Sequence, residues 1–234
     1  MIEMIETGIP KLDQLLKGSI KKGSNMLLIG PPMSGKKVIL NHIMYYNASM
    51  NDNAVITVNT YEPGNRILEW FEENRLPLPE SRIGIVDCIS KMTSYEVAND
   101  NDIIKMANSP LDLTLIGVKI GQLLDKFIRV KHIHNVQLNI NSLSTLLMYS
   151  NIKTVFKFLH VFTGRIKAAG GFGIYVLESG VHDVLAVAAL NQLFDGIIEV
   201  KSENDRNFIR VRGLSQKPTQ WLEYEIDGAH VKIS

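Results

Sequence analysis

The stretch "LLIGPPMSGKKVIL", residues 27–40, places an apolar run, a loop with two glycines and two prolines, and a pair of lysines in direct succession. The apolar run is typical of a buried strand, and the residues after the loop are typical of the start of a helix. Gly30, Gly35 and Lys36 fit the spacing G-x-x-x-x-G-K, in which backbone N–H groups and a helix N-terminus surround a phosphate. The stretch therefore predicts a phosphate-binding loop between a strand and a helix.

The last position of this loop departs from the usual pattern. A Ser or Thr hydroxyl there ligates Mg²⁺, whereas Lys37 carries an ammonium group, which cannot ligate a cation. A second acid normally ends a later strand and holds the same metal, but the best candidate, "VQLNINSLSTLL" (136–147), has Asn141 at that place. We therefore expect a weak or absent Mg²⁺ requirement, with the ammonium of Lys37 partly replacing the metal. In the alternative, Lys37 points into solvent.

The composition of the chain bears on its domain number, its partners and its location in the cell. The 234 residues are 45% hydrophobic, which is enough for a sizeable core and predicts a single domain over residues 1–234. The 25 Lys and Arg balance the 24 Asp and Glu, so nothing global attracts nucleic acid or an anionic membrane. Cys88 has no partner for an internal disulfide, and "MIEMIETGIP" (1–10) does not resemble a signal peptide. We expect a cytoplasmic protein with no membrane segment and no nucleic-acid partner.

Apolar runs alternate with helical segments along most of the chain, which predicts an α/β fold with a mostly parallel twisted sheet flanked by helices. The tail alternates instead, with turn residues between short runs, which predicts C-terminal antiparallel strands. Residues 89–109, with the cluster "ANDND", are expected to form an exposed loop. The pattern predicts strands at 25–29, 54–59, 82–87, 136–141 and 172–178, helices at 111–128 and 152–169, and tail strands at "DGIIEVK" (195–201), "NFIRVRG" (207–213), "WLEYEI" (221–226) and "AHVKI" (229–233).

Several motifs together resemble one known family. "TGIPKLDQLLKGSIKKGSNMLLIGPPMSGKK" (7–37), "TYEPG" (60–64), "INSLSTLL" (140–147), "GFGIYVLESGVHD" (171–183), "FDGIIEVK" (194–201), "FIRVRGL" (208–214) and "WLEYEIDG" (221–228) occur in this order. They are similar to motifs of the RecA-superfamily ATPases related to the circadian clock protein KaiC, and most of all to archaeal single-domain KaiC-like proteins. The resemblance spans the chain and implies a RecA-like P-loop NTPase fold with degenerate metal-binding motifs.

The resemblance also implies a ligand and site residues. It implies that ATP or another nucleoside triphosphate binds to the loop. Glu62 falls where the family has the glutamate that activates the attacking water, although it is also explained as an ordinary turn acid. Asn141 falls at the family's metal-ligating Asp, which predicts weak or absent hydrolysis, and Glu178 matches a polar residue beside the site. The loop residues assigned to the nucleotide are Gly30, Pro31, Pro32, Met33, Ser34, Gly35, Lys36 and Lys37.

The tail carries a further implied contact. Arg210 and Arg212 fall where the family has a basic element that reaches across a subunit boundary to the neighbour's nucleotide. Because they are two residues apart on a strand, both project from the same face. A solvated basic face is the alternative. The resemblance implies a homo-oligomer, such as a hexamer, or a protein partner.

Three functions remain open from the sequence alone, beside a nucleic-acid partner, which RecA relatives have but which the balanced charge of this chain supports little. The first is a regulatory, signal-transducing nucleotide-binding protein with weak or absent ATP hydrolysis. The second is an active ATPase that uses Glu62 as its base, and the third is a protein-interaction module with an empty loop. No His or Cys grouping has metal-ligand spacing, so no protein metal site is predicted.

Overall fold

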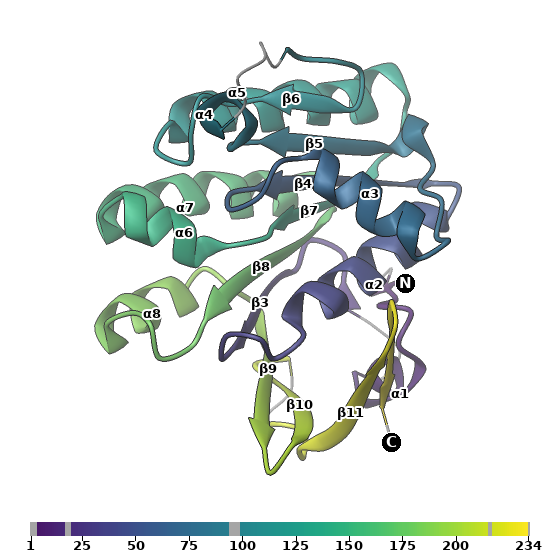
Figure 1. Cartoon of the computed structure of the whole chain (residues 1–234), viewed down its shortest axis with the longest axis vertical. Coiled ribbons are helices and arrows are strands. Elements are labelled where there is room, and N and C mark those ends of the chain that lie inside the picture. Colours follow the sequence, from purple (N-terminus) through teal and green to yellow (C-terminus); the bar gives the residue numbers. More distant parts are fainter. Residues whose placement is uncertain (1–3, 17–19, 94–98, 215–216, 234) are drawn as a thin grey trace.

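The computed structural model describes residues 4–16, 20–93, 99–214 and 217–233, and its main element is a ten-stranded sheet (Figure 1). The strand order is β12-β11-β10-β9-β3-β8-β7-β4-β5-β6. A separate two-stranded sheet pairs β1 (Met4–Ile5) with β2 (Ile20–Lys21). The strands of the large sheet are β3 (Asn25–Gly30), β4 (Asn53–Asn59), β5 (Ile83–Asp87), β6 (Ile104–Met106), β7 (Asn135–Ile140), β8 (Phe172–Glu178), β9 (Gly196–Glu203), β10 (Arg206–Arg212), β11 (Leu222–Asp227) and β12 (His230–Ile233).

The neighbouring strands β9, β3, β8, β7, β4, β5 and β6 run parallel. The C-terminal strands β9, β10, β11 and β12 pair antiparallel, each with the next. This topology confirms the predicted fold class, and the five strands expected in the parallel part are found with ends within one residue. One expectation is wrong in part: β9, expected to be antiparallel, lies parallel to β3 on its other side. The reason is that a helix crossover, rather than a hairpin turn, precedes β9, and a crossover returns the chain in the same direction.

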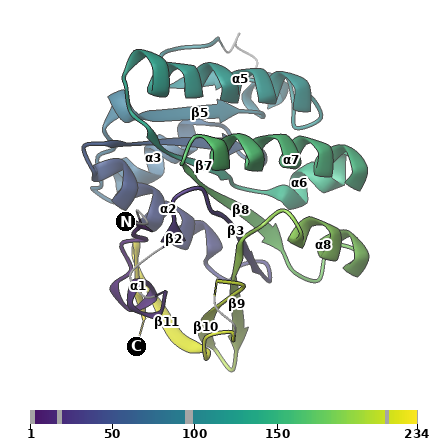
Figure 2. The same cartoon turned by 180° about the vertical axis from the view of Figure 1, so that it is seen from behind.

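Helices cover both faces of the sheet. Figure 1 shows α2 and α3 on the near face, and Figure 2 shows α5 and α7 on the opposite face. A 3₁₀ turn spans Glu80–Arg82, and a π-helical turn, Lys126–Val130, continues α5. The helices are α1 (Pro10–Leu15), α2 (Lys36–Ser49), α3 (Asn65–Glu73), α4 (Ser90–Thr93), α5 (Leu113–Asp125), α6 (Leu143–Tyr149), α7 (Ile152–Ala168) and α8 (Val184–Asn191).

The segment expected to be an exposed loop, residues 89–109, contains a strand instead. In β6, Ile104 and Met106 are buried, and the strand lies parallel to β5 at the edge of the sheet. Asp100 holds this segment, because its carboxylate accepts from the backbone N–H of Met106 at 2.7 Å and pairs with Lys119 of α5. The expectation was wrong because three residues are too few to show a strand period. Part of the expected loop, residues 94–98, lies outside the described residues.

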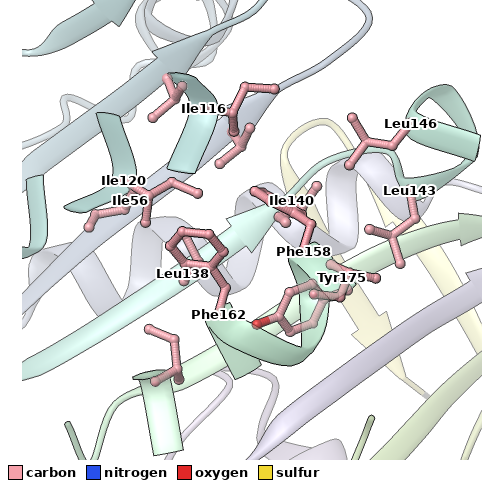
Figure 3. Packing of buried hydrophobic residues seen from close by; sticks show 14 of the residues in the cluster. Ile56, Ile116, Ile120, Leu138, Ile140, Leu143, Leu146, Phe158, Phe162 and Tyr175 are labelled. Carbon is pink, nitrogen blue, oxygen red and sulfur yellow. The ribbon is translucent and has the colours of Figure 1, made fainter. Parts of the chain in front are cut away.

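The largest apolar cluster lies between the sheet and helices α5, α6 and α7 (Figure 3). Ile56, Leu138 and Tyr175 enter it from three neighbouring strands. The Tyr175 hydroxyl is not left without a partner, because it donates to Asn25 Oδ1 at 3.0 Å. A second cluster lies on the other face, between α1, α2 and the C-terminal strands. The two clusters fix the parallel strands whose carboxyl ends carry the site, on the left in Figure 1.

His42 of α2 joins both ends of the chain to the body of the fold. Its Nδ1 accepts from the backbone N–H of Val231 at 3.2 Å, and its Nε2 lies 3.0 Å from the carbonyl oxygen of Gly8. A backbone N–H can only donate and a carbonyl can only accept, so this geometry requires a neutral ring with its proton on Nε2. Burial lowers the pKa of His42 below the usual imidazole value of 6.5, as does His230, 5.8 Å away between ring centroids.

This arrangement predicts a pH-dependent stability. A histidine whose pKa is lowered by folding contributes stability that is present above pH 6.5 and is lost as the pH falls, because the unfolded chain takes up the proton more readily. We compare the free energy of urea unfolding of the parent with that of His42→Gln between pH 5 and 8. The parent's advantage should be about 1 kcal/mol at pH 8, as for one hydrogen bond, and should shrink toward pH 5. An advantage that is constant with pH would contradict the assignment.

Candidate functional site

A cavity of about 400 Å³ lies over the N-terminus of α2, at the carboxyl ends of four parallel strands. Clefts at this edge are the usual binding sites of open α/β sheets. The cavity brings together predicted residues that are far apart in the sequence: the loop from Met33 to Lys37, Glu62 after β4, Asn141 after β7, and Glu178 at the end of β8. Glu178 reaches the loop because it is paired with Gly30 in the parallel register of β3 and β8.

The loop between β3 and α2 has a shape that only glycine permits at two positions. A Cβ on Gly30 would lie 2.3 Å from Val200 Cγ2. Gly35 has φ +76°, and a Cβ there would lie 2.1 Å from Ile226 Cδ1 of β11. The Tyr224 hydroxyl, also on β11, donates to the Ser34 carbonyl. The C-terminal strands thus hold the loop in place without help from a ligand.

The ammonium of Lys36 is almost fully enclosed, with 4% of the side chain exposed. It donates to the Pro31 carbonyl, to Ser34 Oγ at 3.2 Å, and to Glu178 Oε2 at 2.8 Å. An ammonium group has three N–H donors, so the protein's own acceptors use all of them. The lysine is therefore positioned at the loop, as predicted, and is paired with a carboxylate from β8.

Lys37 turns toward the cavity and lies in a second ion pair. Its Nζ is 2.8 Å from Glu62 Oε2, and the side chains of the lysine and the glutamate are 39% and 17% exposed. The other oxygen of Glu62, Oε1, is buried and has no hydrogen-bond partner among the described residues. The carboxylate predicted to activate water is thus engaged with the residue that replaces the metal-binding hydroxyl.

Asn141 ties the ends of two strands together. Its Oδ1 accepts from the N–H of Thr60 at 3.0 Å and from the Thr60 hydroxyl at 3.3 Å. Its Nδ2 donates to Asn59 Oδ1 at 3.1 Å. The Thr60 hydroxyl also lies 3.0 Å from the carbonyl oxygen of Ser142, and its single O–H can donate to only one of the two acceptors. The N–H of Thr60 thus occupies one lone pair of the amide oxygen, and the asparagine is engaged in joining the ends of β4 and β7.

The floor of the cavity contains polar residues that sequence reasoning missed. Asn41 Nδ2 and Thr57 Oγ1 are buried beside the cavity, Asn59 Nδ2 is buried next to Asn141, and these three atoms have no hydrogen-bond partner within the described part of the chain. Asn41 lies four residues after Lys37 on α2, so the two residues share one face of the helix, and both line the cavity. In the sequence, each of these residues is visible only as a polar residue inside an apolar run. That pattern does not distinguish a ligand-binding residue from one that makes a structural hydrogen bond.

Arg210 and Arg212 lie outside the cavity, on one face of β10. Glu199 binds both: its Oε2 accepts from Arg210 Nε, and its Oε1 lies 2.8 Å from Arg212 Nε. The Arg210 guanidinium also lies 4.4 Å from the ring centroid of Trp221. A shallow hollow beside Arg210 is lined by Gly30 and Trp221. The two arginines do share a face, and their contact with a neighbour's nucleotide stays a prediction.

Two further properties concern the described residues as a whole. Within the ranges given above, no group of three or more His, Cys, Asp or Glu side chains is arranged to hold a metal ion. In the same ranges, no helix has the length and apolar character needed to cross a membrane.

Comparison with known proteins identifies the class of fold. The structure of a KaiC-like protein, PH0186, from the hyperthermophilic archaeon Pyrococcus horikoshii OT3 superimposes over 100% of both chains with a TM-score of 0.72 and 14% sequence identity. The chain therefore has a KaiC-like, RecA-type fold. No curated protein matches its sequence. Residues 23–200 match the model of a family of unknown function, DUF7504, and the chain belongs to that family.

The contact between Gly35 and β11 predicts a difference between two glycine substitutions. Gly35 and Gly180 both have φ +76°, but a Cβ on Gly180 meets nothing within 4 Å. We expect Gly180→Ala to lower the free energy of unfolding by about 1 kcal/mol through backbone strain alone. Gly35→Ala should cost about 1 kcal/mol more, because its methyl group overlaps the end of the Ile226 side chain, which must move. Urea unfolding measures both, and Ile226→Ala should restore part of the loss in Gly35→Ala. Equal costs would contradict the contact.

Proposed function

We propose that this protein binds ATP or another nucleoside triphosphate in the cavity over α2, as a single KaiC-like P-loop domain of residues 1–234. The observation that carries the proposal is a rigid glycine loop whose two lysines, Lys36 and Lys37, both turn into one cavity. Backbone N–H groups at the start of α2 and two ammonium groups suit a chain of phosphates. The cavity volume of about 400 Å³ is within the range of small-ligand sites.

The role is regulatory, in cytoplasmic signal transduction of an archaeal cell, with weak or absent hydrolysis. Lys37 stands where a hydroxyl would ligate Mg²⁺, and the oxygen of Asn141 is engaged by Thr60. With neither ligand, the ammonium of Lys37 takes over part of the neutralisation of the phosphates, and Mg²⁺ is weakly bound or not required. The loss of both metal contacts removes several kcal/mol of transition-state stabilisation.

An active ATPase is the second candidate, because Glu62 places a carboxylate in the cavity. A carboxylate near a terminal phosphate can orient water for attack. Steady phosphate release by the parent protein that Glu62→Gln abolishes would favour this candidate. An interaction module without nucleotide is the third, and it requires that the cavity bind no phosphate compound.

Calorimetric titration with ATP, in Mg²⁺ and in EDTA, tests the proposal. We expect the dissociation constants in the two conditions to agree within about an order of magnitude, since a protein without metal ligands gains little from the ion. Lys36→Met should remove most of the affinity. Lys201→Met, which alters a surface lysine outside the cavity, should not change it.

The possible results separate the candidates. Binding that requires Mg²⁺ would contradict the replacement of the metal by Lys37. No binding of any nucleoside triphosphate at millimolar concentration, in either condition, would contradict the proposed function and favour the interaction module.

We also propose a homo-oligomer, such as a hexamer, in which Arg210 and Arg212 contact the nucleotide of the neighbouring subunit. The support is a shared strand face and an ion pair with Glu199 that leaves the two side chains 32% and 42% exposed. The apolar helix α8 adds a surface for contact with another chain, since Val184 and Leu185 are each 79% exposed.

Light scattering measures this assembly directly. ATP should raise the molar mass of the parent, and Arg210→Ala and Arg212→Ala should each reduce that effect, because each removes a cation from the boundary. Arg206→Ala provides a matched control, because Arg206 lies on the same strand but pairs with Glu223 at 3.4 Å, away from the hollow beside Arg210. A mass that ATP does not change would contradict the proposed assembly.

A further inference from the structure

The ammonium of Lys36 cannot accept a new ligand without losing a present one. All three of its N–H donors are used, by the Pro31 carbonyl, by Ser34 Oγ and by Glu178 Oε2. The first two acceptors belong to the loop itself, whose shape is fixed by β11. Glu178 is the partner that can leave, because its side chain is 31% exposed and lies on a different strand. A phosphate oxygen would therefore bind in the place of the Glu178 carboxylate.

The Glu178 side chain can leave while its backbone stays. The backbone N–H of Glu178 donates to Ser144 Oγ at 2.9 Å, and the residue ends β8 in register with Gly30. Rotation of the side chain alone is therefore sufficient to free Lys36. No rearrangement of the sheet is required.

Lys37 is occupied in the same way. Its Nζ pairs with Glu62 Oε2 at 2.8 Å, and Glu62 Oε1 has no partner among the residues that the structure describes. With one oxygen unpartnered, the ion pair with Lys37 is the main contact that this carboxylate loses when a phosphate replaces it.

The two pairs make the cavity electrically balanced. Two ammonium groups face two carboxylates, so a ligand gains little from a net positive field before it binds. The ligand gains binding free energy only when its own anionic groups take the positions of the two carboxylates. A single phosphate group takes the position of one carboxylate, beside one lysine. A chain of linked phosphates can replace both.

We propose that Glu62 and Glu178 set the affinity of this cavity for its ligand, each holding one loop lysine until an anionic group of a polyphosphate ligand replaces it. The inference rests on the proposed function, because it concerns the same site. It assigns to the two glutamates the control of affinity, whether or not the bound nucleotide is hydrolysed.

Titration of Glu62→Gln and Glu178→Gln with ATP and with inorganic tripolyphosphate, both in EDTA, tests the proposal. Glutamine keeps the size of the side chain but is a weaker competitor for an ammonium, so each variant should bind both probes about tenfold more tightly than the parent. Glu203→Gln is the matched control. It also removes one carboxylate from a lysine, Lys201, at 2.6 Å, and changes the net charge equally, but it lies outside the cavity.

The outcomes distinguish this inference from the proposed function. The inference is supported if both cavity variants bind more tightly than the parent and Glu203→Gln binds as the parent does. The same conclusion holds if the parent binds too weakly to measure and both cavity variants bind. Binding by the parent with no gain in either cavity variant overturns the inference and leaves the proposed function intact. An equal gain in Glu203→Gln overturns it as well, because net charge then accounts for the effect. No binding by any of the four proteins overturns both.

Unfolding curves test whether a change in affinity results from a folding defect in the variant. Each variant should unfold with the parent's cooperativity, and Glu178→Asp, which keeps the charge on a shorter side chain, provides a second measurement. Its carboxylate reaches Lys36 less well, so its affinity for ATP should lie between those of the parent and Glu178→Gln. An affinity of Glu178→Asp above that of Glu178→Gln would contradict competition by charge.

Discussion

Two adjacent ammonium groups at the first turn of α2 must be neutralised, and the rest of the site follows from this constraint. A helix N-terminus already carries partial positive charge, so Lys36 and Lys37 add like charge where the helix dipole is least tolerant of it. Without a ligand, the chain supplies the missing anions from the ends of two other strands, as Glu178 and Glu62. The pairs span 142 and 25 residues of sequence, and they require the parallel sheet to be in register.

The loop can present its lysines because the C-terminal strands hold it from the side. Tyr224 and Ile226 of β11 contact Ser34 and Gly35. His42 then fastens β12 to the same helix that the loop begins. The antiparallel tail therefore supports the site as well as closing the edge of the sheet. The entropy cost of ordering the loop is met during folding and is not subtracted from the free energy of ligand binding.

Much of this arrangement could be predicted from the sequence, and the reasons for the rest are physical. The strand–loop–helix around Gly30 and Lys36 was predictable because glycine spacing and apolar runs are local signals. The partner of Lys36 was not, since it depends on which residue of β8 lies beside Gly30. The strand at Ile104–Met106 was missed because three residues are too few to show a strand period. The polar floor of the cavity was missed because Asn41 and Thr57 look like ordinary helix and strand positions until the fold brings them together.

That floor explains why cation chemistry and anion chemistry diverge here. Asn41 presents an amide N–H group to the cavity that no described residue accepts from, and Lys37 adds an ammonium, so these two groups favour an anionic oxygen over a divalent cation. Anionic oxygens meet the same groups as hydrogen-bond donors in a low-dielectric setting, where such bonds are stronger than in water. In the proposed exchange, the freed carboxylates are those of Glu62, in the segment between β4 and α3, and Glu178, at the end of β8. The two glutamates therefore connect the loop lysines to the chain segments that lead into α3 and α8.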